Sequence, residues 1–133
     1  MNLDSIIATL QSVFASFPRI ELVILFGSAV KGRLTTSSDL DVAVAAENSL
    51  STEEKIAIVA SLSAHYPWDI DLIDLQAVSG PILQQALCNG RVVVKRSPRL
   101  LAFLMKKMWF NQADMMPLAK RMLTAHCKQF VRG

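Results

Sequence analysis

Residues 25–45, LFGSAVKGRLTTSSDLDVAVA, constrain the fold more than any other part of the 133-residue chain. An apolar run ends at Gly27-Ser28, ten mostly polar residues follow, and Asp39 and Asp41 stand at the start of the next apolar run. Alternate residues of a strand point to the same face, so the two carboxylates are expected to project together. Such a pair repels itself unless a cation lies beside it. The stretch therefore predicts two strands joined by a loop, with a cation site where they meet.

The rest of the chain predicts one small domain, as its length also suggests. Hydrophobic spacing, turn residues and caps indicate helices over residues 3–16, 52–64 and 81–89, strands over 20–26, 39–45, 68–75 and 91–95, a helical turn and loop over 29–37, and a helical tail from 99 to 130. In the second helix, Ile56, Val59 and Leu62 form the apolar spacing. We expect an α/β (α+β) fold: a small mixed β-sheet flanked by helices, with a catalytic core over 1–97 and a helical tail over 98–133.

A third strand brings further carboxylates. In WDIDLIDL, residues 68–75, Asp69 and Asp71 share one face, whereas Asp74 alternates to the other face and is expected to serve the structure. Strands packed side by side could bring three carboxylates to one spot. A site built from carboxylate oxygens suits Mg²⁺ when a phosphate supplies the remaining ligands. Two such ions, about 3.5–4 Å apart, can hold both oxygens of a phosphoryl or nucleotidyl transfer.

Gly27-Ser28 is suited to the phosphate end of such a substrate. Glycine allows the backbone to approach a ligand closely, and N–H groups at the start of a following helix would favour an anion. The Ser28 hydroxyl adds a donor, and Lys31 and Arg33 are near enough in sequence to neutralise charge. The two halves of the stretch therefore predict a site for the two ends of one nucleoside triphosphate.

The combination GSAVKGRLTTSSDLDV resembles the Gly-Ser, ten residues, Asp-x-Asp signature of the DNA polymerase beta-like nucleotidyltransferase superfamily. The small size, the later DIDLIDL and the segment PILQQALCNGRVVV resemble its minimal nucleotidyltransferases (MNT), over roughly residues 20–95. The resemblance implies a nucleotidyltransferase-like fold and an enzyme that uses ATP and Mg²⁺, with two ions expected. Many members are antitoxins that form a hetero-oligomer with a HEPN ribonuclease toxin and silence it by transferring AMP to a tyrosine.

Carried over to this chain, the resemblance makes Gly27 and Ser28 the residues that hold the nucleotide phosphates. Lys31 and Arg33 are added as further nucleotide contacts. Family members often carry Arg before the intermediate glycine, where this chain has Lys31. Lysine is a point charge without the two-pronged hydrogen bonding of arginine, so its phosphate role departs from the family pattern.

The same resemblance assigns the metal to Asp39 and Asp41. The family pattern of apolar-Asp-apolar-apolar-Asp-Leu fits residues 70–75, which makes Asp71 the third ligand and a base for the attacking hydroxyl. Asp69 lies on the same predicted face and stays as the second choice for that role.

Charge divides the chain into two parts. Residues 1–90 carry a net charge of −6 and residues 91–133 a net charge of +9. Five of the six methionines also lie in the tail, beside several other apolar residues. Methionine adapts to irregular partner surfaces. We expect one apolar stripe of the tail to pack inward and a second, including Met108 and Trp109, to dock a partner protein.

Two alternatives to protein adenylylation remain at this point. The chain could be a non-catalytic antitoxin that acts by docking alone, or it could transfer a nucleotide to RNA or to a small molecule. The basic tail is compatible with RNA, although it lacks interleaved stacking aromatics, so direct nucleic-acid binding is not favoured. No apolar run reaches about 18 residues, the N-terminus has no basic segment, and Cys88 and Cys127 lack metal-type spacing. We expect a cytoplasmic protein without a membrane partner.

Overall fold

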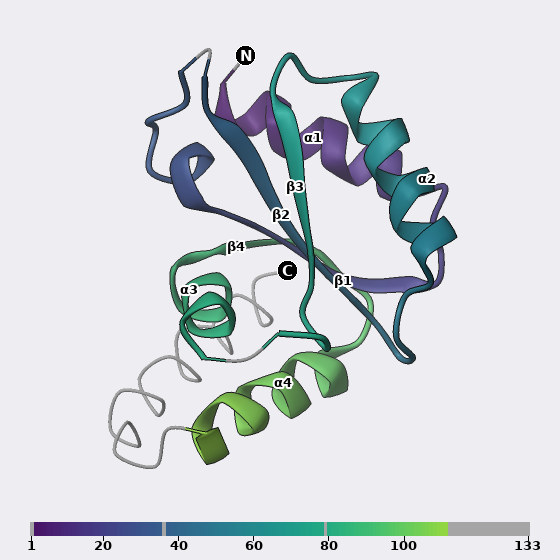
Figure 1. Cartoon of the computed structure of the whole chain (residues 1–133), viewed down its shortest axis with the longest axis vertical. Helices are drawn as coiled ribbons and strands as arrows, with labels where there is room; N and C mark the ends of the chain where they lie inside the picture. Colours follow the sequence, from purple (N-terminus) through teal and green to yellow (C-terminus); the bar gives the residue numbers. More distant parts are fainter. Residues whose placement is uncertain (1, 36, 79, 112–133) are drawn as a thin grey trace.

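The computed structural model describes residues 2–35, 37–78 and 80–111, and all structural statements concern these residues. The elements in chain order are α1 (Leu3–Phe14), β1 (Ile20–Phe26), the 3-10 turn η1 (Gly27–Ala29), β2 (Asp39–Ala46), α2 (Thr52–Ser63), β3 (Asp69–Asp74), α3 (Pro81–Asn89), β4 (Arg91–Lys95) and α4 (Pro98–Asn111) (Figure 1). The order of helices and strands matches the sequence prediction, with ends that differ by one or two residues. In the described parts of the chain, no helix is both long and apolar enough to cross a membrane.

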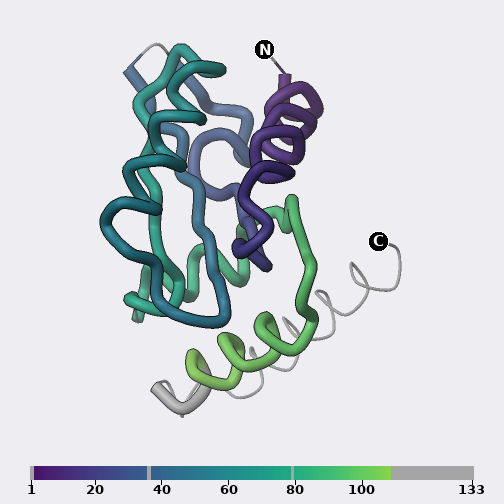
Figure 2. Tube along the Cα trace, turned by 90° about the vertical axis from the view of Figure 1, so that its right-hand side faces the viewer, coloured from purple at the N-terminus to yellow at the C-terminus, as the bar shows by residue number. Residues whose placement is uncertain are grey.

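The four strands form one mixed sheet in the order β3-β2-β1-β4. Strand β1 lies in the middle and pairs antiparallel with both β2 and β4, whereas β2 and β3 are parallel. A parallel pair needs a crossover connection, and α2 supplies it. Helices α1 and α2 lie on one face of the sheet and α3 and α4 on the other (Figure 1). In Figure 2, the two helices of the first face lie in the upper part and α4 at the bottom.

The sheet is buried between two apolar clusters. Strand β1 is buried on both faces, which explains why residues 20–26 form an almost continuous apolar run. The cluster under α1 and α2 includes Ile6, Leu10, Phe14, Val23, Leu25, Leu40, Val42, Val44, Ile58 and Leu62. The cluster under α3 and α4 includes Leu22, Ile24, Phe26, Ala43, Ala45, Leu83, Ala86, Leu87, Leu101 and Leu104. This second face is also the face of the predicted carboxylates, because Asp39 and Asp41 alternate with the residues of the first cluster.

Helix α2 begins as predicted but buries a different stripe. The Ser51 side chain accepts from the Glu54 N–H at 3.1 Å, and the Glu54 carboxylate accepts from the Ser51 N–H at 3.0 Å, which makes a complete capping box. The residues that reach the core are Ile58 and Leu62. Ile56, whose spacing helped to predict this helix, is 63% exposed and lies outside the core. Helix α2 lies beside β3, the terminal strand of the described sheet, and Ile56 lines a groove between the two elements.

Helix α4 is the described part of the predicted tail. It begins at Pro98, and the Ser97 hydroxyl accepts from the Leu100 N–H at 3.2 Å. One stripe packs against the sheet, as expected, through Leu100, Leu101, Leu104, Met105 and Met108. Met108 is therefore a core residue, and its predicted place on a docking stripe is wrong. The Trp109 side chain and residues 112–133 lie outside the described structure, so the rest of the docking prediction is untested.

Candidate active site

The end of β1 and the start of β2 meet as the sequence predicts. Phe26 pairs with Asp41, so the chain turns at Gly27 directly beside that carboxylate. Gly27 has a φ of +74°, a conformation that glycine adopts far more readily than other residues. A Cβ atom at this position would overlap Asp41 Oδ2. The Gly-Ser and Asp-x-Asp halves of the motif therefore depend on each other sterically. Because glycine has no side chain, the Asp41 carboxyl group can occupy the space beside Gly27.

The helical turn after Gly27 begins two residues earlier than the helical turn and loop predicted over residues 29–37. Residues Gly27–Ala29 form a single 3-10 turn, and the Arg33 N–H donates to the Ser28 carbonyl at 2.9 Å. The first N–H groups of such a turn have no carbonyl partner within it, but a single turn carries little dipole. Lys31 and Arg33 are exposed, and within the described residues no hydrogen bond or ion pair joins either side chain to the carboxylates. Their role as nucleotide contacts stays a prediction.

Four aspartates come together where β2 and β3 begin. The parallel register places Asp39 beside Asp69 and Asp41 beside Asp71. Since paired residues of neighbouring strands point the same way, all four project from the face that α3 and α4 cover farther along the sheet. The two residues that sequence reasoning left as alternatives therefore differ in position: Asp71 lies next to Asp41, and Asp69 lies next to Asp39.

The carboxyl groups at this end of the sheet interact strongly. The pKa of Asp41 is raised to about 6, first because the group is partly buried, then because it shares a hydrogen bond with the Asp71 carboxyl and is repelled by the charges of Asp71 and Asp39. These three side chains therefore act on one another, and their combined negative charge is costly. A divalent cation would remove that cost by replacing the shared proton.

The oxygen donors at this site fit Mg²⁺. Within the described residues, no three Asp, Glu, His or Cys side chains surround a point closely enough to hold an ion by themselves. Mg²⁺ is commonly bound by one or two carboxylates together with substrate phosphates and water, so a complete protein cage is not required. The three interacting carboxylates supply oxygen donors of this kind.

Asp74 has the structural role that the alternation predicts. Its carboxyl group is buried and points away from the face of Asp71. It accepts from the Gln76 N–H at 3.0 Å and from the Leu50 N–H at 3.4 Å. These bonds hold the turn after β3 against the segment that leads into α2, and they leave Asp74 outside the candidate site.

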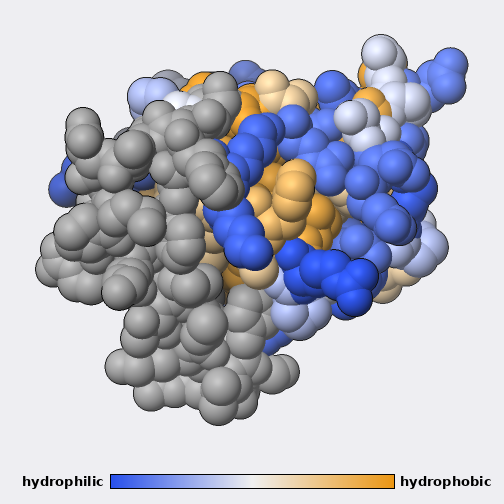
Figure 3. All heavy atoms as spheres, turned by 90° about the horizontal axis from the view of Figure 1, so that it is seen from below, coloured by the Kyte–Doolittle hydropathy of each residue, from blue (hydrophilic) through white to orange (hydrophobic). Residues whose placement is uncertain are grey.

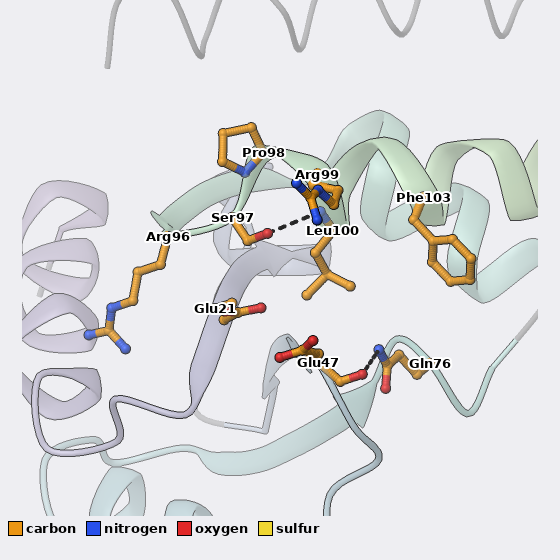
Figure 4. Close-up of a pocket in the computed structure, with 9 residues that line it drawn as sticks. All are labelled: Glu21, Glu47, Gln76, Arg96, Ser97, Pro98, Arg99, Leu100 and Phe103. Carbon is orange, nitrogen blue, oxygen red and sulfur yellow. Dashed lines mark hydrogen bonds between the residues drawn. The ribbon is translucent and has the colours of Figure 1, made fainter.

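A cavity of about 640 Å³ lies at the other end of the sheet, and the sequence analysis did not predict it. Its lining, shown in Figure 4, is Glu21, Glu47, Gln76, Arg96, Ser97, Pro98, Arg99, Leu100 and Phe103. Seen from the α4 side, apolar surface lies open between hydrophilic groups (Figure 3). The cavity contains neither the Gly-Ser turn nor any of the four clustered aspartates, so the chemistry is placed at Asp41, although a groove lined by Asp71 has a smaller volume of about 490 Å³.

Comparisons with known proteins agree with the motif. Residues 8–99 match the family described as polymerase beta, nucleotidyltransferase. The protein adenylyltransferase MntA of Shewanella oneidensis is 31% identical over 91 residues, which are 68% of this chain and 63% of that protein. The match thus spans less than two thirds of the relative's length.

Solved structures show the same fold. A toxin–antitoxin with AMP-PNP contains a chain with a TM-score of 0.69 at 22% identity, covering 88% of this chain and 98% of that one. A complex of tri-AMPylated Shewanella oneidensis HEPN toxin with MNT antitoxin contains one with a TM-score of 0.66 at 21% identity, covering 91% and 98%. Because the family match covers most of the chain and includes Gly27, Ser28 and all four aspartates, this chain belongs to the polymerase beta nucleotidyltransferase family.

Proposed function

We propose that this chain is an antitoxin that transfers AMP from ATP to a tyrosine hydroxyl of a HEPN ribonuclease toxin and thereby inactivates it. The observation that carries the proposal is the convergence of Asp39, Asp41 and Asp71 beside the Gly27 turn. The acceptor class is supported by the relative named a protein adenylyltransferase and by the similar chain in complex with an AMPylated HEPN toxin.

In the proposed site, the Gly27-Ser28 turn receives the triphosphate through its backbone N–H groups and the Ser28 hydroxyl. Asp39, Asp41 and Asp71 would hold Mg²⁺, with phosphate oxygens completing the coordination. When bound, two ions would neutralise the triphosphate and stabilise charge on the attacking and leaving oxygens. The chain itself contributes position, since it fixes the carboxylates on two paired strands and the phosphate turn on a third.

The acceptor oxygen attacks the α-phosphorus of ATP and forms a new P–O bond. The bond from that phosphorus to the bridging oxygen breaks, and pyrophosphate leaves. The hydroxyl proton passes to the Asp71 carboxylate, which lies beside Asp41 in the parallel register of β2 and β3. A general base acts within hydrogen-bond reach of the proton it removes, so the acceptor has to arrive at Asp71 from the open side of β3.

Docking of the toxin body is assigned to the tail, residues 98–133. In its described part, Phe103 is 58% exposed and borders the large cavity. Docking alone, without catalysis, is the second candidate, but a pure binder has no use for repelling carboxylates that destabilise its own fold. Transfer to RNA or to a small molecule would use the same site with a different acceptor. We place the reaction in the cytoplasm.

The experiment uses ATP labelled at the α-phosphate, with Mg²⁺ and the protein encoded beside this chain. We expect label on that protein and none with the Asp39→Ala, Asp41→Ala double variant, and mass spectrometry would locate the modified tyrosine. Label on RNA would move the function to RNA modification. A tight complex without label on either would leave docking alone as the function.

A further inference from the structure

Strand β3 has a free outer edge. It is the terminal strand of the described sheet and pairs only with β2. The Leu75 N–H donates to the Val44 carbonyl at 2.9 Å, and alternate residues share one edge of a strand. The N–H and C=O groups of Ile70 and Leu72 therefore point away from β2. An edge of this kind can pair with an extended backbone from another chain.

A groove of about 490 Å³ runs beside this edge, between α2 and β3. Its lining is Lys55, Ile56, Val59, Ala60, Ile70, Asp71 and Leu72. Most of these side chains are apolar, and Ile56 is the most exposed large apolar residue among those described. The stripe of α2 that the core does not use thus faces the groove. An apolar side chain can enter it while its backbone pairs with β3.

The groove continues into the candidate active site. Asp71 lines the groove and also pairs in register with Asp41, whose carboxyl group adjoins the Gly27 turn. Side chains of an added strand would alternate between the two faces of the sheet. One residue would fill the groove on the α2 face, and the next would lie beside Asp71 on the carboxylate face. A chain bound along this edge therefore delivers every second side chain to the reacting groups.

We infer that the protein acceptor binds as an extended strand along the outer edge of β3. An apolar side chain of the acceptor occupies the groove beside Ile56, and the adjacent residue presents its hydroxyl to Asp71. This inference rests on the proposed protein adenylyltransferase function and names how its substrate is held. It implies that the modified residue is flanked by an apolar residue in an extended segment.

The first test compares Ile56→Glu with Ile82→Glu. Both residues are exposed on helices, at 63% and 45%, but Ile82 lies on α3, outside the groove lining. With the neighbouring protein as acceptor, we expect Ile56→Glu to raise the KM for the acceptor about tenfold or more, with little change in kcat or in the KM for ATP. Ile82→Glu should match the wild type. Equal KM values in all three proteins would overturn the inference while the proposed function stands.

The second test follows amide hydrogen exchange in the wild-type chain with a saturating amount of the same acceptor. We expect slower exchange at the Ile70 and Leu72 amides and no change along β4, the other edge of the sheet. Protection on β4 alone, or on neither edge, would overturn the inference. Protection at Ile70 and Leu72 in a protein that transfers no AMP would support this binding edge and contradict the proposed function.

Discussion

Carboxyl groups lie in opposite electrostatic environments at the two ends of the sheet. At the end where β2 and β3 begin, Asp41 is crowded by Asp71 and Asp39, and its pKa is raised to about 6. At the other end, Glu54 accepts two hydrogen bonds from the Arg19 guanidinium, at 2.7 and 2.8 Å, and its pKa is lowered to about 2. The first end repels its own charges and the second neutralises them.

Other charged groups at the second end follow the same rule. The Arg96 guanidinium donates to the carbonyls of Phe14 at 2.9 Å, Phe17 at 3.0 Å and Ile20 at 2.7 Å. It thereby joins the end of α1, the loop that follows it and the start of β1 to the end of β4, and it adds a charged donor to carbonyls of which two, Phe14 and Phe17, also accept a backbone N–H. Asp74 is buried with two backbone N–H donors. Charged groups at this end have hydrogen-bond partners within the protein and stabilise the fold, whereas the carboxylates at the other end repel one another.

The largest effect is expected from Gly27→Ala, which tests the carboxylate end. The new methyl group would overlap Asp41 Oδ2 and displace that carboxyl group, so AMP transfer should fall on the order of 100-fold or more. Gly32→Ala is the matched control, because Gly32 has a similar φ of +68° but open space around its Cβ position. Both variants carry the same backbone strain. If the two lose activity equally, the spatial coupling between Gly27 and Asp41 is not what the reaction needs.

The second prediction concerns the stabilising end. Arg96→Ala would leave three carbonyl groups without their charged donor, so the free energy of unfolding should fall by about 2–3 kcal/mol. Chemical denaturation measures the change. Arg99→Ala removes an exposed arginine three residues away and should change stability by less than about 0.5 kcal/mol. Similar losses in both variants would mean that net charge, and not these three bonds, matters at this end.

The third prediction returns to Asp41, where removing a charge should stabilise the fold. Its folded pKa lies above the ordinary value of 3.8, so the ionised group destabilises the protein above about pH 6, and this cost fades as the pH falls toward 3.8. The shift corresponds to about 3 kcal/mol at most and to about 1–2 kcal/mol after allowing for solvent screening.

Asp41→Asn should therefore raise the free energy of unfolding by about 1–2 kcal/mol at pH 7.5, measured with EDTA present. The gain should shrink by pH 4. A variant that is less stable than the wild type at pH 7.5 would show that the carboxylate end is not strained by its own charges.

Local patterns were enough to predict the element order and the shared face of Asp39 and Asp41, because strand alternation needs only neighbouring residues. Contacts between distant segments were beyond the sequence. Arg96 bonds carbonyls 76 to 82 residues earlier in the chain. Spacing along α2 could not show that Ile56 lines a groove beside β3 instead of entering the core, since that depends on where β3 ends the sheet. The same limit explains why Met108 was placed on the wrong stripe of the tail.

The smallest effect is expected at the Arg19–Glu54 ion pair, which is exposed and therefore screened by salt. The folded pKa of Glu54 lies below the ordinary value of 4.5, so the pair's stabilisation is complete above that pH and is lost as the pH falls from 4.5 toward 2. Arg19→Gln should lower stability slightly at pH 7, and its difference from the wild type should narrow over this range. The capping box of α2 stays intact in this variant, because Ser51 and Glu54 are unchanged.

Acid thus acts in opposite directions at the two ends: it relieves the repulsion at Asp41 and removes the attraction at Glu54. A difference that stays constant from pH 7 to pH 2.5 would show that Arg19 acts through its bond to the Ser49 carbonyl instead of through Glu54.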